Sequence, residues 1–194
     1  MRHSGIWLPL AAALLITACA NKEEPAKQVV AGAETSIAEV REDATIYAPA
    51  ELKAAEDKLA AAKENITWEK YQDVLDQGPE LKASVTTLKD TVISKKTQVA
   101  AATHEWTTLT EEVPKVVQAL ESRVDALSKV RKLPPEVKKE TFEAAKTELE
   151  TLKTTWAQAG AAFNAGQATE AADKGRAVKA RAEELLQQLG LSPV

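Results

Sequence analysis

The chain has 194 residues, of which 102 are Ala, Glu, Lys, Leu or Arg and only 4% are aromatic. It carries a formal net charge of −4, two histidines and one cysteine, which excludes a broad basic surface for nucleic acid, a histidine-rich metal site and a disulfide framework. This composition is typical of long helices or coiled coils, because strands need β-branched and aromatic clusters that we do not find.

The first eighteen residues predict a secretory signal peptide. A short cationic start precedes the apolar run 6–18, which is shorter than the roughly 20 residues that span a bilayer. The run ends in Leu15-Ile16-Thr17-Ala18, directly before Cys19. These residues resemble the lipobox of bacterial lipoproteins, in which the cysteine becomes the acylated first residue of the mature protein. The alternative is an ordinary signal peptide cleaved after Ala18 or Ala20.

Acylation at Cys19 would tether the mature protein to a membrane. Each buried CH₂ contributes about 0.8 kcal/mol and two chains already give stable anchoring, which a triacylated cysteine exceeds. Ala20, rather than Asp, follows the cysteine, and by resemblance to enteric lipoproteins this indicates the outer membrane, facing the periplasm. Residues 1–18 are therefore expected to form the signal peptide, and residues 19–32 a flexible tether.

Two apolar stripes, over residues 33–47 and 52–66, predict a first helix from about residue 33 to 66. Pro49 lies between the stripes, where a helix can restart with proline in its first turn. We expect this helix to fold back along the next one, so that residues 33–104 form a helical hairpin region.

Aromatic residues provide three candidate partner-binding residues. Trp68 and Tyr71 fall at the expected tip of the hairpin, where they either bind a partner or a membrane surface or simply close the end of the helix seam. Trp106 is expected to meet Trp156 and Phe163 in an aromatic cluster, since counting back from the turns places the three at similar heights.

A heptad pattern between residues 81 and 130 predicts one long packed helix. Of 15 seam positions, spaced alternately by four and three, 13 are apolar, and only Lys95 and Arg123 interrupt the series. The helix is expected to run from about residue 68 to 131, a length of roughly 95 Å. Pro114 should kink it, because the heptad phase continues there. Any break is expected at Gly78-Pro79.

The remaining chain predicts two shorter helices. Pro134-Pro135 marks a turn, and apolar stripes follow over residues 136–163 and again towards the end of the chain, stopped by Gly166 and Gly190. Short turns force neighbouring helices to run antiparallel. Residues 105–194 are therefore expected to form a three-helix region continuous with the long helix.

The expected fold class is all-α: an elongated antiparallel helical bundle or coiled coil of about four helices, one of them long and kinked. In the hairpin region each of the two helices would bury only one stripe. We therefore expect self-association through that region.

We find no pattern typical of an active site. His104 is the one histidine after the signal peptide, and the paired carboxylates, such as Glu111-Glu112, are adjacent residues whose side chains do not converge on a helix. Glycine-rich phosphate loops and nucleophile motifs are missing from the sequence. The protein is therefore expected to be no enzyme and to use no metal or cofactor.

Several stretches of the chain carry a family resemblance. They are Tyr47-Ala48-Pro49-Ala50-Glu51-Leu52-Lys53, Ser122-Arg123-Val124-Asp125-Ala126-Leu127-Ser128, Lys132-Leu133-Pro134 and the segment from Trp156 to Phe163. These stretches resemble Ala-rich helical outer-membrane lipoproteins of unknown function from Gram-negative bacteria. The first also resembles a helical-hairpin domain found before OmpA-like peptidoglycan-binding domains. The resemblance does not extend to that second domain, so it implies no peptidoglycan binding.

The sequence thus predicts an outer-membrane-anchored periplasmic lipoprotein with a structural, scaffold or envelope-interaction role. Its expected partners are the membrane, through Cys19, and a second copy or an envelope protein, but no nucleic acid. The alternative is a binding module for a peptide, lipid or envelope protein, using the tip with Trp68 and Tyr71 or the cluster around Trp106.

Overall fold

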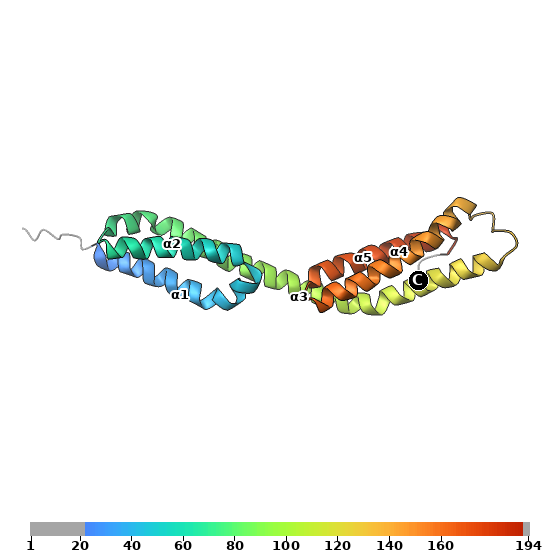
Figure 1. Cartoon of the computed structure of the whole chain (residues 1–194), viewed down its shortest axis with the longest axis horizontal. Helices are drawn as coiled ribbons and strands as arrows, with labels where there is room; N and C mark the ends of the chain where they lie inside the picture. Colours follow the sequence, from blue (N-terminus) through green and yellow to red (C-terminus); the bar gives the residue numbers. More distant parts are fainter. Residues whose placement is uncertain (1–21, 192–194) are drawn as a thin grey trace, which may run out of the picture. The chain divides into compact units, whose positions relative to one another are not determined.

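The computed structural model describes residues 22–191, and this part of the chain is all-α, which confirms the predicted fold class. Its five helices are α1 (Glu23–Tyr47), α2 (Pro49–Thr67), α3 (Tyr71–Lys129), α4 (Lys139–Asn164) and α5 (Ala168–Gln188) (Figure 1). The expected number of about four helices is wrong, because the first predicted helix is two helices. The chain divides into two compact units, unit 1 up to Thr91 and unit 2 from Val92, and α3 contributes to both.

The first predicted helix is divided because the chain reverses at Ala48. This residue has φ −147° and ψ 51°, outside the helical region, and Pro49 then starts α2 at a position where its missing N–H is not needed. Two ion pairs connect α1 with α2, Glu34–Lys63 and Arg41–Glu56. The residue later in α1 pairs with the residue earlier in α2, as expected for antiparallel helices.

Helix α1 begins ten residues earlier than the predicted first helix, at Glu23. Residues 23–32, which we expected in a flexible tether, are its first turns. Ala26, Val30 and Ala33 are buried on one face at spacings of four and three, so this segment packs against the bundle. Pro25 fits in the first turn, because N–H groups there have no partner within the helix.

Unit 1 is a bundle of three helices: α1, α2 and the first part of α3. Lys58 of α2 pairs with Glu80 of α3 at 3.7 Å, and Lys89 of α3 pairs with Glu39 of α1 at 2.9 Å. The interior is filled by small and branched apolar side chains, among them Ile37, Ala44, Leu52, Leu59, Val74 and Leu88. Since three helices pack here rather than two, the reason for expecting self-association through this region no longer holds.

Helix α3 continues through both of its prolines. Neither Pro79 nor Pro114 breaks it, although each removes one backbone donor from the helix interior. At the first site the neighbouring helix lies close, since a Cβ added to Gly78 would stand 3.4 Å from a methyl group of Val29.

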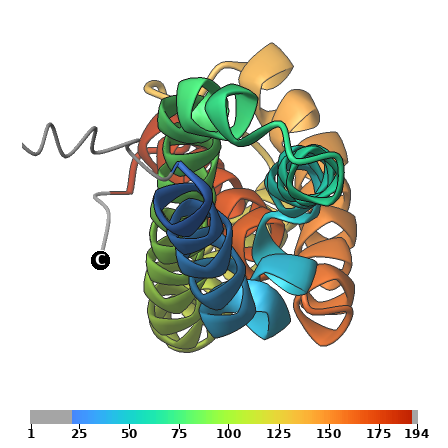
Figure 2. The ribbon, with the colours of Figure 1, turned by 90° about the vertical axis from the view of Figure 1, so that its left-hand side faces the viewer.

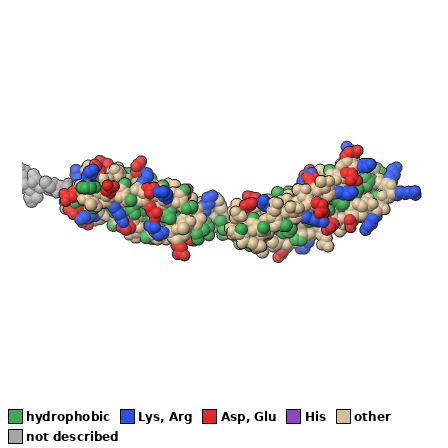
Figure 3. Space-filling view, viewed as in Figure 1, with side chains coloured by type: hydrophobic (Ala, Val, Ile, Leu, Met, Phe, Trp, Pro, Cys, Tyr) green, Lys and Arg blue, Asp and Glu red, His purple; other side chains and the backbone are tan. Residues whose placement is uncertain are grey.

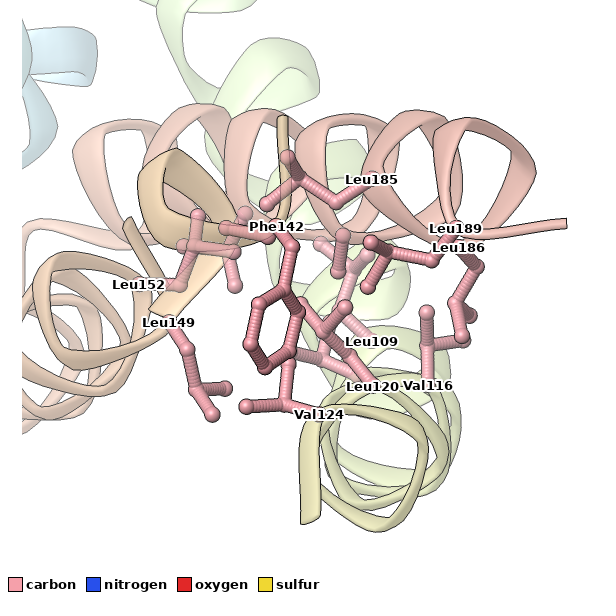
Figure 4. Close-up of a cluster of buried hydrophobic side chains, with 14 of the residues drawn as sticks. Leu109, Val116, Leu120, Val124, Phe142, Leu149, Leu152, Leu185, Leu186 and Leu189 are labelled. Atoms are coloured by element: carbon pink, nitrogen blue, oxygen red, sulfur yellow. The ribbon is translucent and has the colours of Figure 1, made fainter. Parts of the chain in front are cut away.

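Unit 2 packs the second part of α3 against α4 and α5 (Figure 4). Large apolar side chains from all three helices converge in its core, including Leu109, Leu120 and Val124 from α3, Phe142, Leu149 and Leu152 from α4, and Leu185 and Leu186 from α5 with its C-cap residue Leu189. On the face shown in Figure 3, acidic and basic side chains are interspersed over both units.

The two interruptions of the heptad pattern in α3 have different structural explanations. The side chain of Arg123 reaches the end of α5 and hydrogen-bonds to its backbone. Lys95 lies in residues 93–98, a stretch in which every residue is exposed. An apolar seam residue is therefore not needed at either position.

Candidate functional site

The predicted lipid-attachment residue, Cys19, lies outside the described residues. The described chain starts with Lys22, immediately before α1. Across residues 22–191, no helix is both long and apolar enough to cross a membrane.

The turn between α2 and α3 contains a capping motif that is common at the C-terminal ends of helices. Lys70 N–H donates to the carbonyl of Asn65 at 2.8 Å, and Glu69 N–H donates to that of Ile66 at 3.1 Å. These two bonds are the pair that defines a Schellman motif, in which the residue after the C-cap adopts the left-handed conformation. Here that residue is Glu69, with φ 53°, and Trp68 is the C-cap.

The two aromatic residues of this turn differ in their exposure to solvent. The side chain of Trp68 is 66% exposed, whereas Tyr71, the first residue of α3, is half-buried. Trp68 therefore does little to close the end of the helix seam, and Tyr71 covers part of it.

The turn lies at the same end of unit 1 as the start of α1 (Figures 1 and 2). The up-down-up order of the three helices requires this placement. The pKa of Lys27 in α1 is raised chiefly by its hydrogen bond to Glu23 and by the charge of that residue, and nearby Tyr71 adds a smaller effect in the same direction. The exposed indole of Trp68 therefore lies at the end of unit 1 at which α1 begins.

Trp106 forms the expected aromatic cluster, which lies within unit 2. Its ring stacks on that of Trp156, with centroids 4.9 Å apart and planes inclined by 29°, and on that of Phe163, with centroids 5.3 Å apart. Only 7% of Trp106 is exposed. The surface that a partner would need on this ring is therefore covered by the protein's own side chains.

Gly175 of α5 is part of the same cluster. A Cβ at this position would stand 2.9 Å from Cδ1 of Leu109, 3.3 Å from the ring of Trp156 and 3.5 Å from the ring of Trp106. The missing side chain lets α5 approach the stacked rings closely. The sequence pattern does not indicate this role of Gly175, because periodicity shows the face of a residue but not the space beside it.

A groove that the sequence analysis did not predict runs between α1 and α3 in unit 1. It encloses about 700 Å³ and has a largely apolar lining that includes Val29, Gly32, Leu75, Pro79 and Val85. Gly32 has no neighbouring atom within 4 Å of where a Cβ would lie. The small residues of α1 opposite Gly78-Pro79 are the signal that could have indicated it.

Charged side chains connect the helices of unit 2 at its surface. Arg181 of α5 binds both carboxylate oxygens of Glu148 of α4, at 2.7 and 2.6 Å, and this pairing lowers the pKa of Glu148 although partial burial opposes the shift. Lys179 of α5 donates to Glu112 of α3 at 2.7 Å, which raises the pKa of Lys179. These contacts connect α5 to both of its neighbours.

The described part of the chain contains no group of three or more His, Cys, Asp or Glu side chains placed to hold a metal ion. His104 is exposed on α3. Comparison with known protein-family models, curated proteins and solved structures gives no match to this chain. Function is therefore argued from its own residues.

Proposed function

We propose that the protein is an outer-membrane lipoprotein, anchored through Cys19, whose helical body serves in the periplasm as a structural or scaffold protein. The observation that carries the anchor is Leu15-Ile16-Thr17-Ala18-Cys19, placed after an apolar run too short to span a bilayer. Helix α1 begins four residues after Cys19, so the anchor would connect almost directly to the folded body.

The architecture of the body supports the scaffold role. Within residues 22–191 the buried side chains are apolar, and charged groups pair across neighbouring helices at the surface. Long helix faces of mixed charge suit a protein that holds or spaces components of the cell envelope. We propose this role rather than catalysis.

Metabolic labelling tests the anchor. The full chain, expressed in a Gram-negative host supplied with an alkyne-tagged palmitate, should take up the label, lose residues 1–18 and fractionate with the outer membrane. The control Cys19→Ser should take up no label and leave the membrane fraction. An unlabelled wild-type protein, or one cleaved after Ala20, would contradict the proposal.

An elongated body is part of the spacer proposal, on the basis of the heptad pattern. Small-angle X-ray scattering and light scattering on residues 20–194 test it. A monomer with a maximum dimension of roughly 95 Å is expected for a chain built on one long helix. A compact particle of roughly 50 Å, as for a globular chain of this length, would contradict a spacer role and favour ligand binding.

A binding role for the tip is the second candidate function, because the indole of Trp68 is 66% exposed. Trp68→Ala should then abolish binding of the peptide, lipid or envelope protein while the helical circular dichroism signal is retained. A variant that mainly loses thermal stability would instead show that Trp68 has a structural role.

A further inference from the structure

Trp68 is a large apolar side chain that contributes little to the packing of the bundle. In the described part of unit 1, Trp68 and Ile46 are the most exposed large hydrophobic side chains, at 66% and 68%. They lie at opposite ends of the unit, because Ile46 belongs to the last turn of α1 and Trp68 to the turn between α2 and α3.

The end that carries Trp68 is also the end at which the proposed anchor enters. Glu23, the first residue of α1, is the fourth residue after Cys19. A chain of that length spans at most about 14 Å even when fully extended. An acylated Cys19 would therefore keep this end of unit 1 close to the lipid headgroups, which form a layer roughly 5–8 Å thick on each side of the hydrocarbon.

The chemistry of this end favours contact with lipid through the indole ring rather than through charge. Tryptophan concentrates at membrane–water interfaces, where its apolar ring and its N–H group both find suitable surroundings. The flanking charges have both signs, since Lys22 and Lys70 are accompanied by Glu23, Glu24 and Glu69. No strong attraction to anionic lipid follows from such a mixture.

We propose that Trp68 inserts its ring into the headgroup layer of the membrane that holds Cys19, so that this end of unit 1 faces the lipid. The proposal rests on the proposed lipid anchor. The acyl chains supply the attachment and Trp68 determines which surface of the bundle meets the membrane.

Quenching by brominated lipid tests the contact. The processed, acylated protein is reconstituted in vesicles of phosphatidylethanolamine and phosphatidylglycerol, part of which carries bromine near the headgroup end of its acyl chains. Bromine should quench tryptophan emission of the wild type, and Trp68→Ala should lose more than half of that quenching. Replacing phosphatidylglycerol with phosphatidylcholine should change the quenching little, because the contact does not depend on charge.

A relocated tryptophan is the matched control. The double variant Trp68→Ala, Ile46→Trp moves the exposed indole to the other end of α1, about 35 Å away along the helix. It should be quenched no more than Trp68→Ala. The proposal is overturned if wild type and Trp68→Ala are quenched equally, or if the relocated tryptophan is quenched as strongly as the wild type.

The mass of the same sample separates this proposal from the anchor on which it depends. Acylated protein whose Trp68 remains open to acrylamide in vesicles would keep the anchor, overturn the membrane contact and indicate a protein partner for the tip. Protein without acyl groups would overturn the anchor and this inference together.

Discussion

Arg123 donates two hydrogen bonds to the main-chain carbonyl oxygen of Leu189, from Nε at 2.9 Å and from Nη2 at 2.6 Å. Leu189 is the C-cap of α5, where the carbonyl groups lack partners within the helix and carry the negative end of its dipole. A guanidinium group at this point satisfies an otherwise unpaired acceptor and places a positive charge beside it. Arg123, which interrupts the apolar seam of α3, therefore stabilises the C-terminal end of α5.

Replacing Arg123 with methionine keeps the apolar stem and removes both hydrogen bonds. Hydrogen bonds to charged groups contribute about 1.5–3 kcal/mol, so Arg123→Met should lower the free energy of unfolding of unit 2 by about that amount. Urea unfolding followed by circular dichroism measures the change. Arg131→Met, at an exposed arginine between α3 and α4, should have little effect. Equal losses in the two variants would show that Arg123 does not act as a cap.

Glu69 offers a stabilising substitution. Its φ of 53° places a residue with a side chain in the left-handed region, which costs roughly 1–2 kcal/mol relative to a residue without Cβ. Glu69→Gly should therefore raise the melting temperature. Glu64→Gly, in the last turns of α2, should lower it, because glycine is unfavourable inside a helix. Calorimetry on the two variants would contradict the Schellman geometry if both changes were destabilising.

Gly175 should not tolerate a larger residue. The side chain of Gly175→Val would overlap Leu109, which is itself buried, and press on the ring of Trp156, at a cost of about 1–3 kcal/mol for overpacking. Near-ultraviolet circular dichroism of the stacked tryptophans and thermal unfolding both report the effect. Gly160→Val is the control, since a Cβ there meets nothing within 4 Å. Retained tryptophan signals in Gly175→Val would mean that α5 can move away without loss.

The ion pair between Glu148 and Arg181 should make stability depend on pH. Hydrogen bonding to Arg181 lowers the folded-state pKa of Glu148 below its ordinary value of 4.5, although partial burial opposes this. The contribution is therefore complete above the unfolded-state pKa and is lost as the pH falls through the lower folded-state value.

Glu148→Gln measures this contribution. At neutral pH it should cost about 0.5–1 kcal/mol, the upper range for an exposed pair, and the difference from wild type should vanish in acid. Glu143→Gln, at an exposed carboxylate of α4 whose ion pair with Lys146, at 3.3 Å, lies within the same helix, provides a comparison for the loss of one negative charge. A difference from wild type that persisted in strong acid would assign the effect to packing instead.

The tryptophans of the two units should differ in their importance for folding. Trp106→Ala removes a ring that is 7% exposed and stacked on two others, for which a loss of about 3–5 kcal/mol is typical. Trp68→Ala removes a ring that is 66% exposed and should change the free energy of unfolding by less than about 0.5 kcal/mol. Thermal unfolding of the two variants compares them directly, and similar losses would mean that Trp68 closes the helix seam.

Helix identity could be predicted wherever apolar spacing was long and regular. Gly166 and Gly190 correctly marked the ends of α4 and α5, since both adopt the positive φ that a helix-ending glycine supplies. The reversal at Ala48 could not be predicted, because a single non-helical residue before a proline produces a kink or a full turn with the same local sequence. The start of α1 was missed because Pro25 and its charged neighbours suggested a tether.

The candidate sites differ in how far the sequence could predict them. The contact of Trp106 with Trp156 and Phe163 followed from counting residues back from the turns, because helical rise is constant. The role of Arg123 could not be found in the same way, since its acceptor lies 66 residues away and the bond depends on how α3 and α5 meet. The exposure of Trp68 is likewise a property of the turn geometry at Glu69.

Residues 93–98 of α3 are all exposed, so this stretch contributes no buried side chain to either core. Short isolated helices are marginal in water, and such a stretch transmits little of the cooperativity that buried side chains provide. Its amide protons should exchange with solvent by local opening, while those in the two cores exchange only when the respective unit opens. A single free energy of unfolding for the whole chain would then combine two separate stabilities, one for each unit.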